Sequence, residues 1–234
     1  MPDRPQPPGS RTDRILAAAG ELLLRLGYRK VTIEDIARQA RIGKGTVYLH
    51  WRTKAQLFEA LLARESIELT EEVLTELRRD PSAVLPHRLM RTMFLATDRR
   101  PLVKALLTGD MELLGKLADS PLGKQDAIAN AEFFAVMARY GLLRTDLAHL
   151  DYTMQAAMTG FYMLDKLNPE VAALDAHAKA DGLAHTVRCA FEPDTEPPPD
   201  VLAAASAETI AVFEDMITSL SQWIYWHDPE PQSG

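Results

Sequence analysis

The segment between Thr32 and Thr53 constrains the fold more than any other part of this sequence. Apolar residues recur at helical spacing after Thr32 and again after about Lys44, and only a few residues separate the two patterns. Asp35 follows Thr32 at the spacing of a capping box, in which the threonine begins a helix. Gln56 stands in the same relation to Thr53, which predicts the start of a longer helix. Two short helices joined by so tight a turn predict a helix-turn-helix, the second helix of which enters the major groove of DNA.

A longer amphipathic helix is expected before this pair. Ser10 and Asp13 have the spacing of a helix cap. Gly27 is expected to end the helix, because glycine adopts the left-handed conformation that closes a helix without a steric penalty. The residues from 10 to 53 are therefore expected to form a helix-turn-helix domain behind a disordered lead at residues 1–9. The face of the first helix that packs on the other two carries Ile15, Ala19, Leu22, Leu23 and Leu26.

The second short helix has an inner and an outer face. Val47 and Trp51 are separated by about one helical turn and are expected to face the domain core. Gly45, in the first turn, allows the backbone to approach a base or a phosphate closely. Lys54, in the first turn of the next helix, opposes the helix macrodipole and favours an external anion such as a phosphate. The outer face carries Lys44, Thr46, Leu49 and His50.

Charge is distributed unevenly along the chain. Residues 1–64 contain 12 basic and 6 acidic residues, a formal net charge of +6, whereas residues 65–234 contain 14 and 27, a net charge of −13. We call residues 1–64 the head and the rest of the chain the body. A basic head joined to an acidic body favours contact between the head and a polyanion such as nucleic acid.

These segments resemble the TetR family of transcriptional regulators. The resemblance covers roughly the first quarter of the chain, from about Arg11 to Leu62. It rests on the first helix ending in LGY and on the segments VTIEDIARQA, IGKGTVYLHW and TKAQLFEALL. Members often carry glycine in the turn between the two short helices, where this chain has Arg41.

Resemblance to the family implies which residues touch DNA. Thr32 and the backbone around Gly43 contact a phosphate or the edge of the groove. The residues that face the bases are Lys44, Gly45 and Thr46. The residues that hold phosphates are Tyr48, His50 and Lys54. On the residues alone, a core position for the tyrosine and a solvated position for the histidine are the alternatives.

The rest of the chain is expected to be helical, because no alternating strand pattern of useful length occurs. A long helix begins at Lys54 and continues without a breaker to Pro81, so it links the head to the body. We therefore expect an all-α fold, with residues 54–234 as an effector-binding and dimerisation domain. Further helices are expected at residues 85–99, 101–117, 124–140, 147–167, 177–191 and 200–226.

Two of these helices are typical of a dimer interface. The helix at 147–167 contains Ala156, Ala157 and Gly160, which permit close helix approach. The helix at 200–226 is apolar on more than one face and needs cover on more than one side. Resemblance to the family implies a homodimer, in which the last two long helices of each subunit form a four-helix bundle across a two-fold axis. A dimer doubles the contacts to a palindromic operator; a single-chain core is the alternative.

Methionine and aromatic residues are concentrated between the head and these helices. Methionine adapts to varied shapes, so the set is suited to a cavity for a small apolar or amphipathic effector. An ordinary hydrophobic core is the alternative. Resemblance to the family implies that the effector moves the fourth helix and thereby releases the DNA. The pocket residues expected on this basis are Met90, Phe94, Met111, Phe134, Met137, Met158, Phe161 and Tyr162.

The sequence contains no motif of a catalytic or cofactor site. Patterns such as GxSxG, a Walker loop, Rossmann glycines and HExxH are absent, so we expect neither an enzyme nor a cofactor. One helix repeats potential metal ligands at every fourth position, but only neighbouring members converge on one face, so no metal site is expected. These ligands are His177, Asp181, His185 and Cys189. A helical enzyme and a metal-responsive sensor, each with a helix-turn-helix, are the alternative functions.

The protein is expected in the cytoplasm and away from membranes. Its single cysteine, Cys189, forms no internal disulfide. Charged residues interrupt every apolar stretch before it approaches the roughly 20 residues that span a bilayer. The opening MPDRPQPPGS also lacks the apolar segment of a signal peptide.

Overall fold

A computed structural model describes residues 11–119, 122–168, 170 and 173–225. Within these ranges all regular secondary structure is helical, which confirms the all-α prediction, and no helix there is both long and apolar enough to cross a bilayer. The first helices are α1 (Arg11–Lys30), α2 (Ile33–Ala40), α3 (Lys44–His50), α4 (Lys54–Arg79), α5 (Pro86–Asp98) and α6 (Pro101–Leu107). They are followed by α7 (Met111–Leu114), α8 (Leu122–Arg139), α9 (Leu150–Leu167), α10 (Ala176–Phe191) and α11 (Pro199–Tyr225). Two short 3₁₀ helices are η1 (Pro81–Val84) and η2 (Gly115–Asp119).

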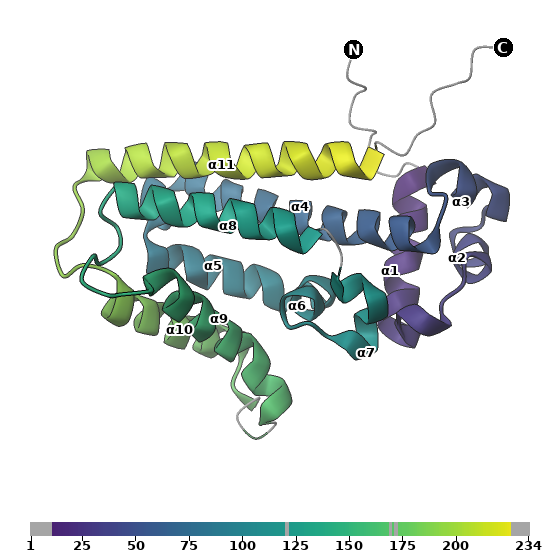
Figure 1. Ribbon diagram of the computed structural model, residues 1–234, viewed down its shortest axis with the longest axis horizontal. Coiled ribbons are helices and arrows are strands. Elements are labelled where there is room, and N and C mark those ends of the chain that lie inside the picture. The colour runs from purple at the N-terminus through teal and green to yellow at the C-terminus, as the bar shows by residue number, and fades with distance from the viewer. Residues whose placement is uncertain (1–10, 120–121, 169, 171–172, 226–234) are drawn as a thin grey trace, which may run out of the picture.

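The long helix α4 connects a small head to a larger body. Helices α1, α2 and α3 form the head, at the right of Figure 1, and α4 runs from it along the body. Within the body α11 lies along α4 and α8, while α5 packs against α10. Helix α9 packs on α10 at the lower side of the body in this view.

Both capping boxes predicted within the head are present. The Thr32 hydroxyl accepts a hydrogen bond from the Asp35 N–H at 3.1 Å, and the Asp35 carboxylate accepts one from the Thr32 N–H at 3.2 Å. Thr53 and Gln56 make the same reciprocal pair at the start of α4, with both distances 3.1 Å. Each box satisfies backbone N–H groups that the first helical turn leaves unpaired. The cap expected at Ser10 lies outside the described residues.

Val47 and Trp51 attach α3 to the head. Their exposed fractions are 0% and 2%, and they join the hydrophobic cluster that contains Ile36 and Ala37 of α2. This confirms the predicted inner face of α3. Because these two side chains fix the rotation of a short helix, they also decide which of its residues face solvent.

Helix α4 takes part in two hydrophobic cores. Its residues Leu57, Phe58 and Leu61 pack in the head, whereas Val73 and Leu77 pack in the body. A displacement of α4 relative to the body therefore moves the head as well. The domain division between residues 53 and 54 stays a prediction, because α4 belongs to both parts.

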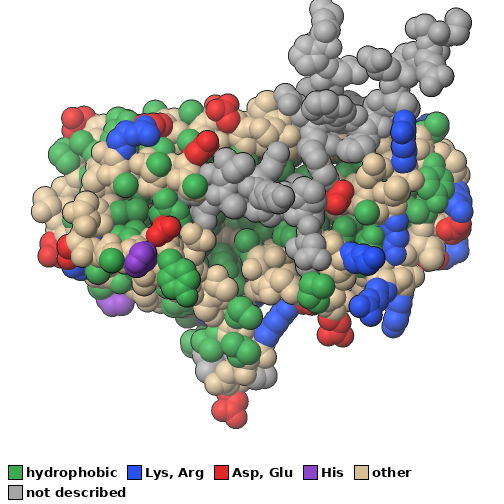
Figure 2. Space-filling model, viewed as in Figure 1, with side chains coloured by type: hydrophobic (Ala, Val, Ile, Leu, Met, Phe, Trp, Pro, Cys, Tyr) green, Lys and Arg blue, Asp and Glu red, His purple; other side chains and the backbone are tan. Residues whose placement is uncertain are grey.

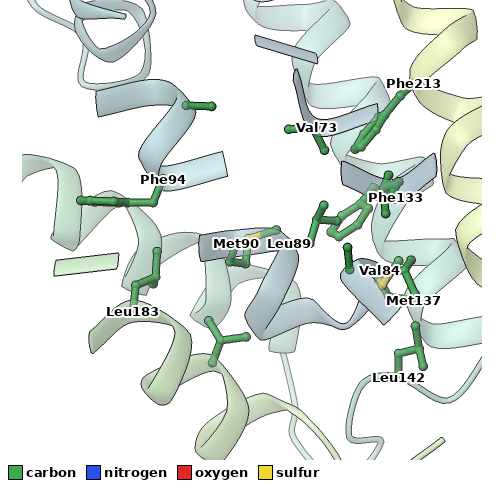
Figure 3. Close-up of a cluster of buried hydrophobic side chains, with 14 of the residues drawn as sticks. Val73, Val84, Leu89, Met90, Phe94, Phe133, Met137, Leu142, Leu183 and Phe213 are labelled. Atoms are coloured by element: carbon green, nitrogen blue, oxygen red, sulfur yellow. The ribbon is translucent and has the colours of Figure 1, made fainter. Parts of the chain in front are cut away.

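The core of the body is built from side chains of α4, α5, α8, α10 and α11 (Figure 3). The rings of Phe133 and Phe213 stack with their centroids 6.2 Å apart. Phe94 stacks on Tyr162 at 5.1 Å, which joins α5 to α9. These aromatic contacts tie helices that are distant in the sequence.

The single helix predicted at residues 101–117 is wrong, because the chain there forms α6, a turn, α7 and η2. Gly109 adopts a positive φ of 60° just after α6. The Asp110 carboxylate then accepts a hydrogen bond from the Leu113 N–H at 3.1 Å and caps α7. A left-handed glycine followed by an N-cap ends one helix and begins another even where the apolar spacing continues. The other predicted body helices are present, with ends that differ by three residues at most.

Helix α1 is interrupted at Gly27, where the sequence predicts the end of the first helix. The backbone at Gly27 does leave the helical conformation, with φ 73° and ψ 158°, but helical residues resume as far as Lys30. Helix α7 packs at this kink, and a Cβ added to Gly27 would lie 3.4 Å from the Glu112 carbonyl oxygen. The glycine therefore interrupts the helix, as predicted, and also allows the close approach of α7 to α1.

Candidate nucleic-acid interface and ligand cavity

The outer face of α3 is open to solvent. Tyr48 is 42% exposed and Leu49 66% exposed, next to the fully buried Val47. A Cβ added to Gly45 would meet no atom within 4 Å, so the backbone of the first turn is open as well. The predicted base-facing and phosphate-holding residues of this helix are therefore accessible. Among them Gly43, Lys44 and Gly45 are exposed, while Thr46 and His50 are partly exposed.

Thr32 is exposed, but its hydroxyl already makes two contacts within the cap. Besides accepting from the Asp35 N–H, it donates to the Asp35 carboxylate at 2.6 Å. This hydrogen bond is the main reason why the pKa of Asp35 lies below its usual value. A hydroxyl has one hydrogen to donate, and the cap already uses it. Because a phosphate oxygen needs a donor, a phosphate contact would fall to the neighbouring backbone.

Lys44 forms an ion pair with Glu34 of α2 across the helix-turn-helix. The Nζ atom contacts the Glu34 carboxylate and lies 5.7 Å from the centre of the Tyr48 ring. The hydrogen bond to Glu34 raises the pKa of Lys44 and lowers the pKa of Glu34. Both side chains are about half exposed, and ion pairs of this kind contribute little to stability. The ammonium group is therefore available for exchange with a phosphate or a base.

Lys54 is held by Tyr28 of α1. Its Nζ donates a hydrogen bond to the Tyr28 carbonyl and lies 4.3 Å from the centroid of the Tyr28 ring. Burial lowers the pKa of Lys54. The carbonyl and the ring supply a negative partner within the head, so they explain the lysine at a helix N-terminus without an external anion. Contact of Lys54 with a phosphate stays a prediction.

Arg41 adopts the left-handed conformation in the turn between α2 and α3, with φ 56° and ψ 48°. Its N–H donates to the backbone carbonyls of Ala37 and Arg38, which closes α2. Glycine is the residue that takes this conformation without a penalty. The turn therefore forms although Arg41 stands at the position where members of the resembled family often carry glycine. Arg41 is exposed beside α3.

Basic side chains gather on the head. Figure 2 shows Lys and Arg residues over the right side of the molecule, where α1, α2 and α3 lie in Figure 1. This agrees with the positive formal charge of residues 1–64. A surface of this kind attracts the phosphate backbone of a nucleic acid.

The body contains a cavity of about 350 Å³. Six helices surround it, namely α4, α5, α6, α8, α9 and α11. The α4 wall combines residues at helical spacing, which are Ser66, Leu69, Thr70 and Val73. The other lining residues are Met90, Met93, Thr97, Val103, Leu107, Phe133, Phe134, Gln155, Met158, Thr159, Tyr162, Phe213 and Met216.

The structure brings four of the eight expected pocket residues together around this cavity, namely Met90, Phe134, Met158 and Tyr162. The others lie elsewhere. Phe94 and Met137 are buried in the adjacent core, and Met111 is 56% exposed on α7. Phe161 lies against α10, where a Cβ added to Gly182 would be 3.7 Å from its ring.

The sequence does not identify several residues that shape these sites. Glu34 and Tyr28 hold Lys44 and Lys54, yet no local pattern links them to those lysines. In the cavity, Thr70 and Thr97 are polar residues on buried helix faces. Their spacing from the apolar residues of α4 and α5 is a usable signal, because a polar residue in an apolar stripe must find a partner.

The histidine and cysteine stripe of α10 does not assemble a metal site. Cys189 Sγ lies 3.7 Å from His185 Nε2, but Asp181 is bound to Arg91 at 2.6 Å. In the part of the chain that the structure describes, no group of three or more His, Cys, Asp or Glu side chains is placed to hold a metal ion.

The helix-turn-helix matches a known family. Residues 15–61 match the model described as bacterial regulatory proteins, tetR family. The transcriptional repressor KstR2 of Mycolicibacterium smegmatis is 38% identical over 61 residues, which cover 26% of this chain and 30% of that protein. The chain thus matches less than a third of the length of this curated relative. Its printed name describes a transcriptional repressor.

Solved structures extend the similarity into the body. A protein described as a transcriptional regulator from Streptomyces coelicolor is 28% identical, with a TM-score of 0.57, and the match covers 79% of this chain and all of that one. FadR, a fatty acid degradation regulator from Bacillus halodurans, is 15% identical with a TM-score of 0.60, over 78% of this chain and 96% of that one. This second likeness concerns the fold alone. Family match, relatives and structures agree, and the helix-turn-helix of this chain belongs to the TetR family of bacterial regulatory proteins.

Proposed function

We propose that this protein is a transcriptional repressor that binds a palindromic operator as a homodimer and is released by a small apolar or amphipathic effector. The observation that carries the proposal is the orientation of α3. Val47 and Trp51 are buried, and the opposite face, which includes Tyr48 and Leu49, is exposed. A short helix fixed in this way presents a constant set of side chains to the major groove. We place the protein in the cytoplasm, together with its operator.

The exposed residues of α3 suit two kinds of DNA contact. Tyr48 and His50 carry hydrogen-bonding groups that hold phosphates and position the helix. Lys44 and Thr46 reach base edges, the lysine toward guanine acceptors and the threonine methyl toward thymine. Gly45 leaves room for the duplex to approach the backbone. Lys44 exchanges its exposed ion pair with Glu34 for the DNA contact.

The homodimer is proposed to form through α9 and α11. On α9 the side chains of Tyr152, Leu164 and Leu167 are 74%, 41% and 73% exposed. A Cβ added to Gly160, on the same helix, would meet nothing within 4 Å. Burial of such a surface against a second copy removes apolar area from water. Exposed alanines on α11 are Ala203, Ala204, Ala207 and Ala211.

The cavity is connected to the head through α4. Ser66 and Val73 mark the stretch of α4 that lines the cavity, and Phe58 and Leu61 of the same helix pack in the head. An effector that binds more tightly when α4 is displaced favours the state in which the two recognition helices do not fit the operator. An effector with equal affinity for both states would not release the DNA.

Selection from a pool of random duplexes tests the proposal. Duplexes retained by the purified full-length protein are sequenced, and the bound site is mapped by footprinting. The expected result is a two-fold symmetric site with half-sites about 34–36 Å apart or more, bound by two chains in native mass spectrometry. Retention of random duplexes without any shared sequence would contradict the proposal.

A further inference from the structure

We propose that the cavity is selective for an uncharged, mainly apolar molecule that carries a hydroxyl or carbonyl group, and that it rejects carboxylates and organic cations. The inference deepens the proposed function and rests on it for the regulatory consequence. The binding preference itself concerns only the cavity.

The walls of the cavity are largely apolar and adaptable. Met90 and Met93 of α5 face it together with Met158 of α9, and aromatic rings of α8 and α11 complete the wall. Its volume of about 350 Å³ lies at the smaller end of the range of small-molecule sites. Methionine side chains repack around ligands of different outline. A compact lipophilic molecule therefore fits better than a large polar one.

No charged side chain lines the cavity among the residues that the structure describes. Two acidic groups near the cavity, Asp98 and Asp165, are paired with lysines. Asp98, which follows the lining residue Thr97, accepts a hydrogen bond from Lys104 at 2.9 Å. Asp165 binds Lys179 at 2.8 Å and Lys104 at 3.4 Å. This network joins α5, α6, α9 and α10. Within it, the charges of the two carboxylates are balanced by the charges of the two lysines.

Among the described lining residues none can act as a counter-ion, and this decides which ligands are accepted. A carboxylate or an ammonium group that enters an apolar cavity loses its hydration, and without a partner this loss is not offset. A neutral molecule has no such penalty. Its apolar part gains from burial in proportion to the area removed from water.

Three buried hydroxyl groups determine which polar group a ligand must carry. Thr70, Thr97 and Tyr162 are 4%, 2% and 4% exposed, and all line the cavity. Thr70 donates to the Ser66 carbonyl at 2.9 Å, so its oxygen keeps lone pairs for a ligand donor. Tyr162 is hydrogen-bonded to Thr97, and burial raises the pKa of its phenol to about 12. These neutral hydroxyls match a hydroxyl or carbonyl group on the ligand, and they supply no full charge.

Helix α9 forms the edge of the cavity toward solvent. Gln155 and Thr159 line the cavity and are exposed, one turn apart on the helix that also contributes Met158. Within one subunit, a substitution at Thr159 therefore changes the charge of the cavity without disturbing a buried core.

Three probes of equal chain length test the selectivity. Isothermal titration calorimetry measures binding of 1-decanol, decanoate and decyltrimethylammonium to the full-length protein near neutral pH. We expect decanol to bind at least about tenfold more tightly than either ion, because only the ions lose hydration without a partner. Binding of either ion as tightly as decanol would overturn the proposal, and so would the absence of binding by all three.

Two variants tie the result to the cavity. Met158→Trp fills the space and is expected to abolish decanol binding, whereas Met163→Trp, on the same helix and outside the lining, is expected to preserve it. Thr159→Lys supplies a cation at the rim and is expected to tighten decanoate binding by about tenfold, with little effect on decanol. Unchanged decanoate affinity in a folded Thr159→Lys protein would show that charge is not what the cavity selects.

Mobility shift of the selected duplex on the same samples separates the two proposals. Decanol selectivity without DNA binding would overturn the proposed function and leave the cavity assignment in place. DNA binding without decanol selectivity would overturn the cavity assignment alone.

Discussion

The ammonium group of Lys54 lies 4.3 Å from the centroid of the Tyr28 ring and donates a hydrogen bond to the Tyr28 carbonyl. The same ring meets Phe58 edge to face at 5.4 Å. It also packs on the turn after α7, where a Cβ added to Gly115 would lie 3.3 Å from it. Tyr28 therefore joins the start of α4 to the α7 turn. Lys54 stabilises this joint in addition to the phosphate contact predicted for it.

Replacement of Lys54 tests its internal role. Lys54→Met removes the hydrogen bond and the cation–π contact while it keeps most of the aliphatic stem. We expect the free energy of unfolding to fall by about 1 kcal/mol in urea denaturation. Lys30→Met, at an exposed lysine of α1, is the matched control and should have little effect. Equal stability of both variants would show that the Tyr28 contact contributes nothing.

Arg41 is expected to cost stability in the turn. Arg41→Gly should raise the free energy of unfolding by about 0.5 kcal/mol, because relief of the left-handed strain exceeds the entropy that glycine adds to the unfolded chain. Arg38→Gly, within α2, should lower it by about 1 kcal/mol. Thermal and urea unfolding of both variants measure the two changes. A loss at Arg41 as large as that at Arg38 would contradict the assignment of strain.

Adjacent residues of α3 should differ strongly in their response to truncation. Val47→Ala removes buried methyl groups and is expected to lower the free energy of unfolding by about 2 kcal/mol. Tyr48→Ala, at the exposed neighbour, should change it by less than about 0.5 kcal/mol. Urea unfolding compares the two proteins directly. Similar losses at both positions would mean that the tyrosine ring is part of the core.

Ionisation of Tyr162 is expected to lower the free energy of unfolding at alkaline pH. Its pKa is raised from 10.0 to about 12 in the folded protein, mainly by burial. Below pH 10 the phenol is protonated in both states, so its contribution is fully present; between pH 10 and about 12 only the unfolded state loses the proton, and stability declines. Between about pH 9 and about pH 11 the expected loss is about 1 kcal/mol.

The Tyr162→Phe protein is the control for this pH dependence. It keeps the other tyrosines, so the difference between the two proteins isolates the contribution of Tyr162. Urea unfolding at both pH values should show a smaller decline in the variant. The same decline in both proteins would place the titration elsewhere.

Features of the head that depend on local sequence could be predicted. The capping boxes at Thr32 and Thr53 involve residues three positions apart, and the inner face of α3 follows from the spacing of Val47 and Trp51. The partner of Lys54 could not be predicted, because Tyr28 is 26 positions away and is brought near only when α1 and α4 pack. A local rule therefore attributed the lysine to an external anion.

The cavity shows a similar limit. Methionine and aromatic content pointed to α5, α8 and α9, which line the cavity, but also to α7, which does not, and it did not point to α4, α6 or α11. Composition does not separate lining residues from core residues. Phe94 and Phe134 are equally suited to both, and only the packing of α5 and α8 directs Phe134 to the cavity. The break at Gly109 was also missed, because the apolar spacing on either side of it is continuous with one helix.

Affinity for the selected duplex as a function of salt concentration tests the central claim most directly. Fluorescence anisotropy compares the wild-type protein with the triple variant Lys44→Ala, Tyr48→Ala and His50→Ala, after circular dichroism has confirmed that the variant is folded. We predict that the logarithm of the wild-type affinity falls linearly with the logarithm of the salt concentration, and that the variant binds at least about 100-fold more weakly with a slope reduced by about one. A folded variant with wild-type affinity and slope would contradict the claim that the outer face of α3 binds DNA.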